Sequence, residues 1–344
     1  MSAPSYLQLA LAEGSPANST AAVAELQHDL RALGYLKSGI DGVFGKGTTR
    51  AIRALQYDLL HNDGRGSDGD APVAMTSLNL DADGAQIVTA VDGVFSQSLG
   101  ALLYSIMQDA RIAHVPESRD PVTANRDAVF AIAGAPSRVA PTPFLLAMAE
   151  QESNKRHFLV PHGDDKDSFV IVGMDRNGQS QDQITSRGYG IGQATIFHHP
   201  LSQGDVVDVV NNPVGNVQNA YRELRAKFDH FVVGNAPARD RQVEHPHLPL
   251  RLCRYQPTDD RYMNDCLGCA REVRKLEIER GTPLYAGSTG SYQPTQYYAS
   301  SNYSNVPDRA EFLCDWPYAA RRYNGEGANS YHYQTKILLN LLRG

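Results

Sequence analysis

The stretch DGVFGKGTTRAIRALQYDL, residues 41–59, decides the fold expected for the first part of the chain. An Asp-Gly turn leads into a segment whose apolar residues recur at helical spacing. Residues 92–110, DGVFSQSLGALLYSIMQDA, start with the same DGVF sequence and also run into an apolar-periodic segment. Such self-similarity indicates a helical unit that is used twice.

A further helix is predicted upstream of the first copy. In residues 19–36, STAAVAELQHDLRALGYL, the apolar residues recur at helical spacing, with Ser19 or Thr20 as N-cap and Gly34 as the stop. Between the two copies, residues 61–72 are rich in Gly and Asp, which predicts an exposed loop. The first part of the chain is therefore expected to be a small helical module.

The pattern LQxxLxxLGY…DGxFGxxTxxAIxxLQ, over residues 20–60, resembles the peptidoglycan-binding domain type 1, a three-helix module. The resemblance implies peptidoglycan as a partner and places the contact with the cell-wall peptide at residues 39–48. We expect Asp41, Gly42 and Phe44 to contribute to wall binding there. Turn, cap and core roles also account for each of these three residues taken singly.

The bulk composition limits the classes of partner. The 344 residues are enough for two domains, each with its own core. The net charge of −6 argues against nucleic acid, because a phosphate-binding face leaves a basic excess. No apolar run reaches the roughly 18–20 residues that a membrane helix needs, so no membrane span is expected. The first residues lack a basic stretch and a long apolar region, so no Sec signal is expected either.

The sequence predicts no cofactor, but two metal readings stay open. The cysteines can form two disulfides, a four-thiolate zinc site or free thiols; the single CxxC pair favours disulfides, because four-cysteine zinc motifs usually have two such pairs. Residues 175–182, DRNGQSQD, loosely resemble a calcium loop but lack the full EF-hand pattern. The adjacent His198 and His199 are interpreted as loop packing. The four cysteines are Cys253, Cys266, Cys269 and Cys314.

A Pro-, Ala- and Ser-rich stretch at residues 111–141 predicts the boundary between two domains. We expect a peptidoglycan-binding domain over residues 1–115, a linker over 116–140 and a second domain over 141–344. The second domain opens with FLLAMAEQES, which predicts a helix that ends on Glu150 and Glu152. Residues two apart are separated by about 200° around a helix, so these two glutamates are expected to point to different sides.

Three later motifs give the second domain a family resemblance. Residues 167–178 alternate enough to form one strand of a small β-hairpin. Residues 184–195 contain GYGIGQ, which can belong to a hairpin, a phosphate loop or a tight packing site, although the Lys-Ser/Thr of a Walker loop does not follow. In order, Glu152-Ser153, GYGIGQ and the Tyr-Asn-Gly at 323–325 resemble the goose-type lysozyme and lytic transglycosylase family, which cleaves peptidoglycan glycan. The resemblance spans residues 143–343 and implies a mainly α (α+β) fold: a three-helix binding module plus a lysozyme-like helical domain with a small β-hairpin.

The resemblance also assigns roles. Glu152 matches the family's catalytic acid, and Glu150 does not. Cleavage of a glycosidic bond needs a carboxylic acid that is still protonated near neutral pH, and burial favours that form. Tyr189 is expected to supply a sugar platform, while Gln193 and the Tyr323–Asn324 pair are expected to hold the substrate's acetamido groups and the acid. The substrate-binding set is Ser153, Tyr189, Gly190, Gln193, Tyr323 and Asn324.

Whether a second carboxylate takes part is left open. Inverting hydrolysis needs a base roughly 6.5–9.5 Å from the acid, whereas a lytic transglycosylase needs none, because the acid itself returns as the base. Asp175 is the best candidate for a second catalytic carboxylate. Asp167, Asp164 and Asp165 follow, although a turn or surface role accounts for each of the four acids.

The sequence thus predicts a muramidase or lytic transglycosylase that cuts the MurNAc-β-1,4-GlcNAc bond and is anchored to the wall by its N-terminal module. The alternative is a non-catalytic peptidoglycan-binding protein with an inactive lysozyme-like domain. Without a Sec signal, two routes from the cytoplasm to the wall are considered, namely phage endolysin release and type VI secretion. The mild acidity favours the secreted effector, which implies a cognate immunity protein as a further partner.

Overall fold

The computed structural model describes residues 3–16, 18–37, 39–134, 142–230 and 316–324, together with 333, 336, 337 and 340. All four cysteines lie outside the described residues, so the choice between disulfides, zinc and free thiols stays a prediction. The mainly α (α+β) class is confirmed, because helices dominate and the strands form small antiparallel sheets. Among the described residues, no helix is long and apolar enough to cross a membrane.

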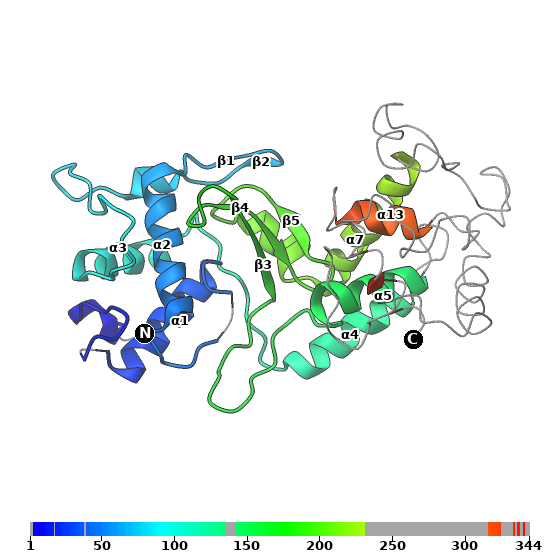
Figure 1. Ribbon diagram of the computed structural model, residues 1–344, viewed down its shortest axis with the longest axis horizontal. Helices are drawn as coiled ribbons and strands as arrows, with labels where there is room; N and C mark the ends of the chain where they lie inside the picture. Colours follow the sequence, from blue (N-terminus) through cyan, green and yellow to red (C-terminus); the bar gives the residue numbers. More distant parts are fainter. Residues whose placement is uncertain are drawn as a thin grey trace, which may run out of the picture. The chain divides into compact units, whose positions relative to one another are not determined.

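Three helices form the N-terminal module, as the repeat predicts (Figure 1). Ser19 caps the first helix by accepting a hydrogen bond from the Ala22 backbone N–H, and Ser96 caps the third in the same way for Leu99. Their apolar faces share one core, in which Leu26 is fully buried. The helices are α1 (Thr20–Ala32), α2 (Lys46–His61) and α3 (Gln97–Gln108).

The predicted β-hairpin is present and gains a third strand. β3 (Val172–Arg176) pairs antiparallel with β4 (Ile184–Tyr189), and β4 pairs with β5 (Ala194–Ile196). The turn into β5 runs through Gly190, which has a positive φ of 70°. The glycine-rich segment is therefore a strand–turn–strand unit and not a phosphate loop.

Contacts between Cα atoms divide the chain into two compact units. Unit 1 combines residues 1–128 with 156–216, and unit 2 combines residues 129–155 with 217–344. Each unit joins segments that are distant in the sequence, so this division follows packing rather than chain order. The predicted domain boundaries at 1–115, 116–140 and 141–344 stay a prediction.

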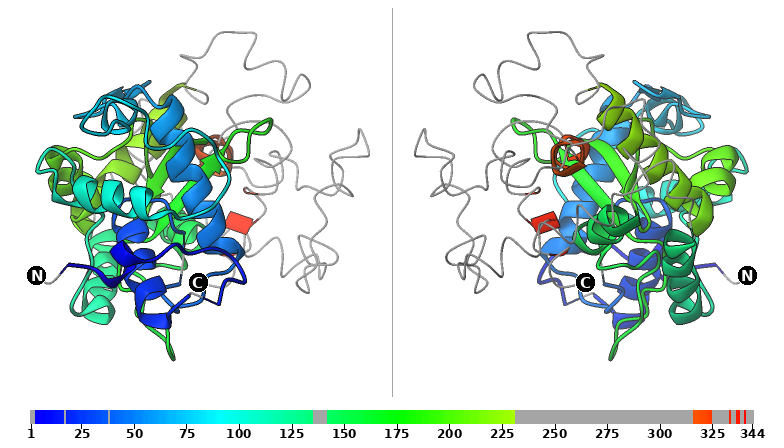
Figure 2. Two further views of the ribbon diagram at one scale, coloured as in Figure 1. Left: turned by 90° about the vertical axis from the view of Figure 1, so that its left-hand side faces the viewer. Right: turned by 90° about the vertical axis from the view of Figure 1, so that its right-hand side faces the viewer.

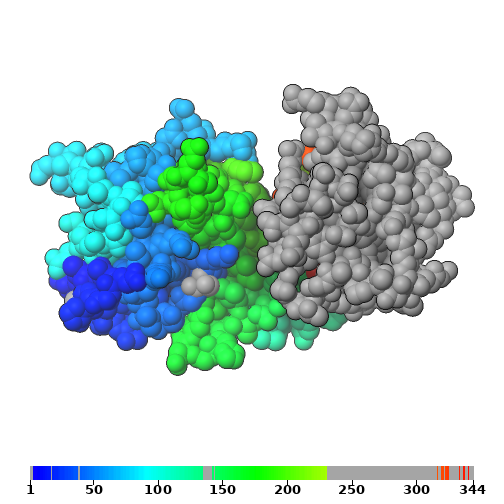
Figure 3. Space-filling model, viewed as in Figure 1, coloured from blue at the N-terminus to red at the C-terminus, as the bar shows by residue number. Residues whose placement is uncertain are grey.

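Unit 1 joins the helical module to the segment of the three-stranded sheet through one buried and one partly exposed ion pair. Arg187 of β4 lies 3.4 Å from the Asp58 carboxylate of α2 and hydrogen bonds to the Gly34 carbonyl. Arg53 of α2 makes two hydrogen bonds to Asp182, at 2.8 and 2.6 Å. Figure 2 shows the strands beside α2, and in Figure 3 the green atoms of the sheet segment meet the blue atoms of the helices. The helices and the sheet therefore share one packed body.

Unit 2 holds the helix that ends on the two glutamates. This helix, α5, is contacted by α13, and the Phe228 ring of α7 stacks on Trp316 of α13 with ring centroids 4.1 Å apart. The phenol of Tyr221 on α7 donates a hydrogen bond of 2.7 Å to the Ile132 carbonyl of α4. The helices of unit 2 are α5 (Thr142–Ser153) and α13 (Trp316–Tyr323), together with the later parts of α4 (Pro121–Ala133) and α7 (Pro213–Phe228), which begin in unit 1.

The remaining elements are short connections. The insertion between the two DGVF copies carries the hairpin β1–β2 and a 3-10 turn, and residues 203–210 form a helical turn that widens into a π-helical one. These elements are η1 (Ser5–Gln8), β1 (Arg65–Gly66), β2 (Gly69–Asp70), η2 (Met75–Leu78), α6 (Gln203–Asp205) and η3 (Val206–Val210).

Candidate functional site

A buried glutamine organises the predicted wall-binding loop. The Gln27 amide on α1 donates to the Asp41 carboxylate at 2.9 Å, and to the Val43 carbonyl and Thr48 hydroxyl at 3.1 Å each. Its carbonyl oxygen accepts the Gly42 N–H at 2.8 Å. One side chain therefore satisfies both ends of the loop, and the loop is rigid because leaving these buried groups unpaired is costly.

The second DGVF copy is built in the same way. The Gln56 amide on α2 donates to the Asp92 carboxylate at 2.7 Å and to the Val94 carbonyl at 3.1 Å. The Gln56 carbonyl oxygen accepts the N–H groups of Asp92 and Gly93 at 3.0 and 2.8 Å. In the sequence, each of these glutamines follows a leucine, in the pairs Leu26-Gln27 and Leu55-Gln56. The sequence analysis did not predict that these glutamines hydrogen bond to the loops. Helix α2 thus follows the first loop and anchors the second.

The three predicted wall-binding residues serve mainly to build the loop. Asp41 accepts hydrogen bonds from Gln27 and from the Val43 N–H, and Phe44 is buried in the core. Gly42 has a φ of 72°, and a Cβ there would lie 2.5 Å from the Thr20 methyl group. The loop presents Val43 outward with 62% of its surface exposed. A wall contact by Asp41, Gly42 and Phe44 stays a prediction, and Val43 is the apolar side chain placed to make one.

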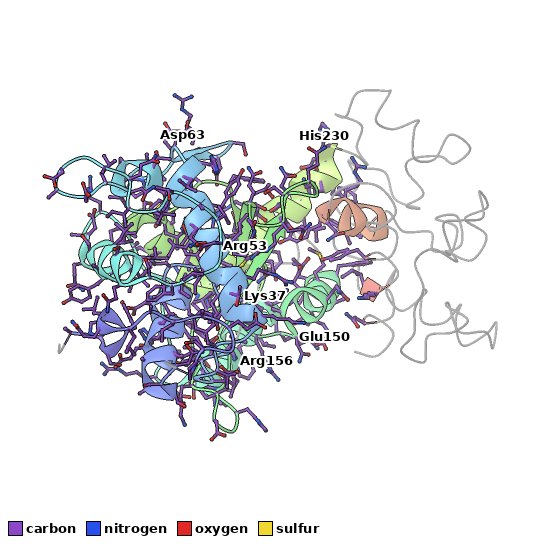
Figure 4. All side chains as sticks on the ribbon, turned by 60° about the vertical axis from the view of Figure 1, so that its left-hand side comes forward. Lys37, Arg53, Asp63, Glu150, Arg156 and His230 are labelled. Carbon is purple, nitrogen blue, oxygen red and sulfur yellow. The ribbon has the colours of Figure 1, made fainter. Side chains whose placement is uncertain are left out.

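The two glutamates of α5 have different partners, as the helical spacing predicts. The Glu150 carboxylate, labelled in Figure 4, lies 3.2 Å from the Lys155 ammonium group, and both side chains are partly exposed. Glu152 accepts a hydrogen bond of 2.6 Å from the phenol of Tyr333. Glu150 is thus a half-exposed acid neutralised by its neighbour, whereas Glu152 is a half-buried acid that accepts a hydrogen bond from the buried Tyr333.

The charge of Glu152 acts on two tyrosines of unit 2, Tyr323 and Tyr333. Burial raises the pKa of Tyr323 well above its usual value, and the charges of Glu223 and Glu152 raise it further. Burial and the same two carboxylates also raise the pKa of Tyr333. Both phenols therefore stay protonated and act as hydrogen-bond donors. Sequence reasoning missed Tyr333 and Glu223, which carry no local motif.

The end of α5 is a compact polar turn. Ser153 is buried and donates a hydrogen bond of 3.0 Å to the Ala149 carbonyl one turn back. Asn154 and Lys155 then adopt left-handed φ angles of 55° and 56°, and their N–H groups bond to the last carbonyls of the helix. Ser153 therefore helps to close the helix, and a substrate-binding role for it stays a prediction. Asn324, directly after α13, is exposed.

His157 and Asn216 hold the glycine-rich turn of unit 1. The His157 Nε2–H donates to the Val210 carbonyl at 2.9 Å, and its Nδ1 accepts the Ile191 N–H at 3.2 Å. The Asn216 side chain accepts the Gly192 N–H and donates to the Tyr189 carbonyl, each at 2.8 Å. Burial lowers the pKa of His157 to about 4, so the imidazole is neutral at physiological pH. Neither residue was singled out from the sequence.

Gln193 folds back over the turn instead of extending from it. Its amide donates a hydrogen bond of 2.8 Å to the Gly190 carbonyl, and its φ is 49°. The Gln193 carboxamide oxygen lies against Gly173 and Gly188 on the two neighbouring strands, where any side chain would collide with it. A larger residue at either glycine would therefore displace the Gln193 side chain from this position. Direct substrate contacts by Gly190 and Gln193 stay predictions.

Tyr189 lies where it cannot serve as a sugar platform in the described structure. Its side chain is only 1% exposed and packs in the core beside Val172 and Ile196. The inward direction follows from strand alternation, because Tyr189 shares a face of β4 with the buried Arg187. The residue supports the turn by packing.

The candidate second carboxylates are placed in unit 1. Asp175, on β3, is exposed and accepts a hydrogen bond of 3.0 Å from the Ser186 hydroxyl on β4. Asp167 is buried in an ion pair with Arg31, and Asp165 accepts the Ile40 and Asp167 N–H groups. Asp165 and Asp167 thus have structural partners, and a catalytic role for Asp175 stays a prediction. Over the described ranges, no group of three or more His, Cys, Asp or Glu side chains is arranged to hold a metal ion.

Comparison with known proteins adds one finding. Residues 19–59 match the family described as the peptidoglycan binding domain. The match supports a peptidoglycan-binding module that spans α1, the first DGVF loop and α2, and it supports the cell wall as the place where the chain binds. No curated protein and no solved structure matches the chain.

Proposed function

We propose that this protein cleaves the glycan strands of peptidoglycan at the MurNAc-β-1,4-GlcNAc bond, with Glu152 as the catalytic acid. The observation that carries the proposal is the hydrogen bond from the Tyr333 phenol to the Glu152 carboxylate at 2.6 Å. Glu152 lies at the end of a helix and beside protonated phenols, whereas Glu150 is neutralised by Lys155. The Tyr333 phenol holds the Glu152 carboxyl group in place, and a general acid must be positioned in this way to donate a proton to a leaving oxygen.

The peptidoglycan-binding module supports the same substrate. A wall-binding module concentrates a catalytic domain on its polymer, so each part can bind weakly by itself. Hydrolysis and anhydro-ring formation are the two possible outcomes at the muramyl carbon. In hydrolysis water supplies the oxygen, and in transglycosylation the muramyl 6-hydroxyl does, with Glu152 returning as the base.

Zymography on purified cell wall tests the proposal. Wild type is expected to clear the gel, Glu152→Gln to lose activity by at least 100-fold, and Glu150→Gln to keep most of it, since general acid catalysis contributes about 10²–10⁴-fold. Glu150→Gln is the matched control, because it removes the same charge from the same helix. Equal and minimal clearing by wild type and Glu152→Gln would instead support a non-catalytic wall-binding protein.

Mass spectrometry of the released fragments separates the two chemistries. Anhydro-muramyl ends identify a lytic transglycosylase, and reducing ends identify a hydrolase. A secreted antibacterial effector is the proposed setting, with phage endolysin release as the alternative. The effector setting further requires an immunity protein that blocks the catalytic domain. The immunity protein can be sought among the proteins encoded next to this one. Each candidate is co-expressed with the active protein in cells that export the active protein, and survival of these cells identifies the immunity protein.

A further inference from the structure

Helix α2 carries a row of cations that begins directly after the loop presenting Val43. Lys46, Arg50 and Arg53 follow the i, i+4, i+7 spacing, which places all three on one side of the helix. Lys46 and Arg50 are exposed, and Arg53 is partly exposed. Helix α2 belongs to the segment that matches the peptidoglycan binding domain. The row therefore lies on the wall-binding module.

The β3–β4 hairpin adds a fourth cation to this row. Arg53, labelled in Figure 4, makes two hydrogen bonds to Asp182 in the hairpin loop, at 2.8 and 2.6 Å. The guanidinium group of Arg176, the last residue of β3, donates a hydrogen bond of 2.6 Å to the carbonyl of Gln181. Because Gln181 and Asp182 are consecutive, Arg53 and Arg176 bind the same short stretch of the loop.

The neighbouring acids already have partners. Asp182 pairs with Arg53, and the Asp175 carboxylate accepts a hydrogen bond from a serine hydroxyl of β4. The charge of Asp92 acts on Arg53, and this carboxylate is also bonded to a glutamine of α2. Within the residues that the structure describes, neither Arg50 nor Arg176 forms an ion pair, since the hydrogen bonds of Arg176 go to a carbonyl and a thioether.

Arg176 is a cation whose charge is incompletely balanced. Burial lowers the pKa of its guanidinium group, and the charges of Arg50 and Arg187 lower it further. The charges of Asp182 and Asp58 oppose this shift without cancelling it. An arginine nevertheless stays protonated in a protein, so the excess positive charge persists. An anion supplied by a ligand would relieve it.

We propose that Arg50 and Arg176 form a carboxylate-binding site of the wall-binding module, which takes the free carboxylates of peptidoglycan stem peptides. A guanidinium group matches a carboxylate through two parallel hydrogen bonds. The chain has a net charge of −6, so an anionic wall peptide needs such a local concentration of cations. Asp182 holds the hairpin on α2 through Arg53 and thereby keeps the two arginines in one place. The inference concerns binding and does not depend on the proposed cleavage.

Co-sedimentation of the full chain with purified sacculi that lack teichoic acid, carried out on ice, tests the site. Arg50→Gln and Arg176→Gln are each expected to bind about tenfold more weakly, because each loses a charge-assisted contact with the wall. Arg65→Gln is the matched control: it removes the same charge from the exposed Arg65 of β1 and is expected to bind as wild type does. Arg50 is exposed, so Arg50→Gln is expected to melt as wild type does.

A second comparison changes the wall instead of the protein. The stem-peptide carboxylates of the same sacculi are converted to methylamides with a carbodiimide. Wild type is expected to bind the amidated sacculi about tenfold more weakly than the untreated ones. Arg50→Gln is expected to distinguish the two less well, because part of its contact with the carboxylates is already gone. This comparison needs no variant of the half-buried Arg176.

Two results would overturn the inference. One is equal binding of wild type to amidated and untreated sacculi. The other is binding by Arg50→Gln and Arg176→Gln at the level of Arg65→Gln. Preferential binding to walls that carry teichoic acid, unaffected by amidation, would assign the cations to phosphate and would also reject the carboxylate site. Sedimentation measures binding whether or not the wall is cut, so failure of the proposed cleavage would be seen separately by zymography.

Discussion

Arg31 and Asp167, 136 positions apart in the chain, form a fully buried ion pair with Nε 2.8 Å from Oδ2. The Arg31 guanidinium also donates to the Val170 carbonyl, so the last turn of α1 is bonded to the segment that leads into β3. The pair fixes the helical module and the sheet segment of unit 1 to each other. It also gives Asp167 a structural role.

Removing one partner of this pair is expected to cost far more than removing an exposed one. Asp167→Ala leaves the Arg31 charge buried and uncompensated, which costs about 3–5 kcal/mol of unfolding free energy. Urea denaturation measures the loss. Asp127→Ala, in the exposed pair of Arg126 and Asp127, is the control and is expected to change stability by less than about 0.5 kcal/mol. A small effect of Asp167→Ala would mean that the pair does not hold unit 1 together.

Substitution by alanine is expected to lower stability at Gly42 and to raise it at Gly47. Gly42 combines a φ of 72° with contact to Thr20, so Gly42→Ala is expected to destabilise the module by about 1–3 kcal/mol. Gly47 lies in the first turn of α2 with nothing within 4 Å of an added Cβ, so Gly47→Ala is expected to raise stability by up to about 1 kcal/mol. Thermal melting of the two variants measures both signs, and stabilisation by Gly42→Ala would contradict the loop geometry.

The exposed valines of the two DGVF loops distinguish which loop binds the wall. Val43→Asp is expected to reduce co-sedimentation with insoluble peptidoglycan about tenfold, since a charge replaces an apolar contact. Val94→Asp, at the matching place in the second loop, is the control and is expected to bind as wild type does. Both valines are exposed, at 62% and 44%, so neither change should alter melting. Equal losses would show that both loops bind.

His157 is expected to make unit 1 sensitive to acid. Burial lowers its pKa to about 4 in the folded chain, whereas an unfolded histidine titrates near 6.5. A depressed folded pKa contributes stability that is fully present above about pH 6.5 and is lost as the pH falls toward 4. Between pH 7 and 4, wild type is expected to lose about 3 kcal/mol more unfolding free energy than His157→Gln. Urea titrations at each pH measure the difference, and parallel curves would contradict it.

His198 is expected to change stability with pH in the direction opposite to His157. Burial would lower its pKa, but hydrogen bonds to Asp205 and Asp68 outweigh burial and raise it. A raised folded pKa contributes stability that is present below the unfolded value and is lost as the pH rises through the folded one. Wild type is therefore expected to lose stability relative to His198→Gln as the pH rises from about 6 to 8. A constant difference across this window would show that His198 is neutral in the folded chain.

The local elements were predictable because their signals are local. The repeat of DGVF, the spacing of apolar residues and the Ser19 and Gly34 boundary signals predicted α1, α2 and α3, and alternation predicted the strand β3 of a small hairpin. The helical spacing also predicted that Glu150 and Glu152 face different partners. Each of these inferences depends on residues that lie within a few turns of one another.

The sequence by itself determined the helical module, the two DGVF loops and the position of Glu152 at a helix end. Only the tertiary structure decided that Gln27 and Gln56 hold those loops by hydrogen bonds. It also decided that Tyr189 points into the core and that Tyr333 hydrogen bonds to Glu152. The reason is physical: helix periods and turns follow from neighbours in the chain, whereas the burial and charge of a side chain depend on residues far away in the sequence.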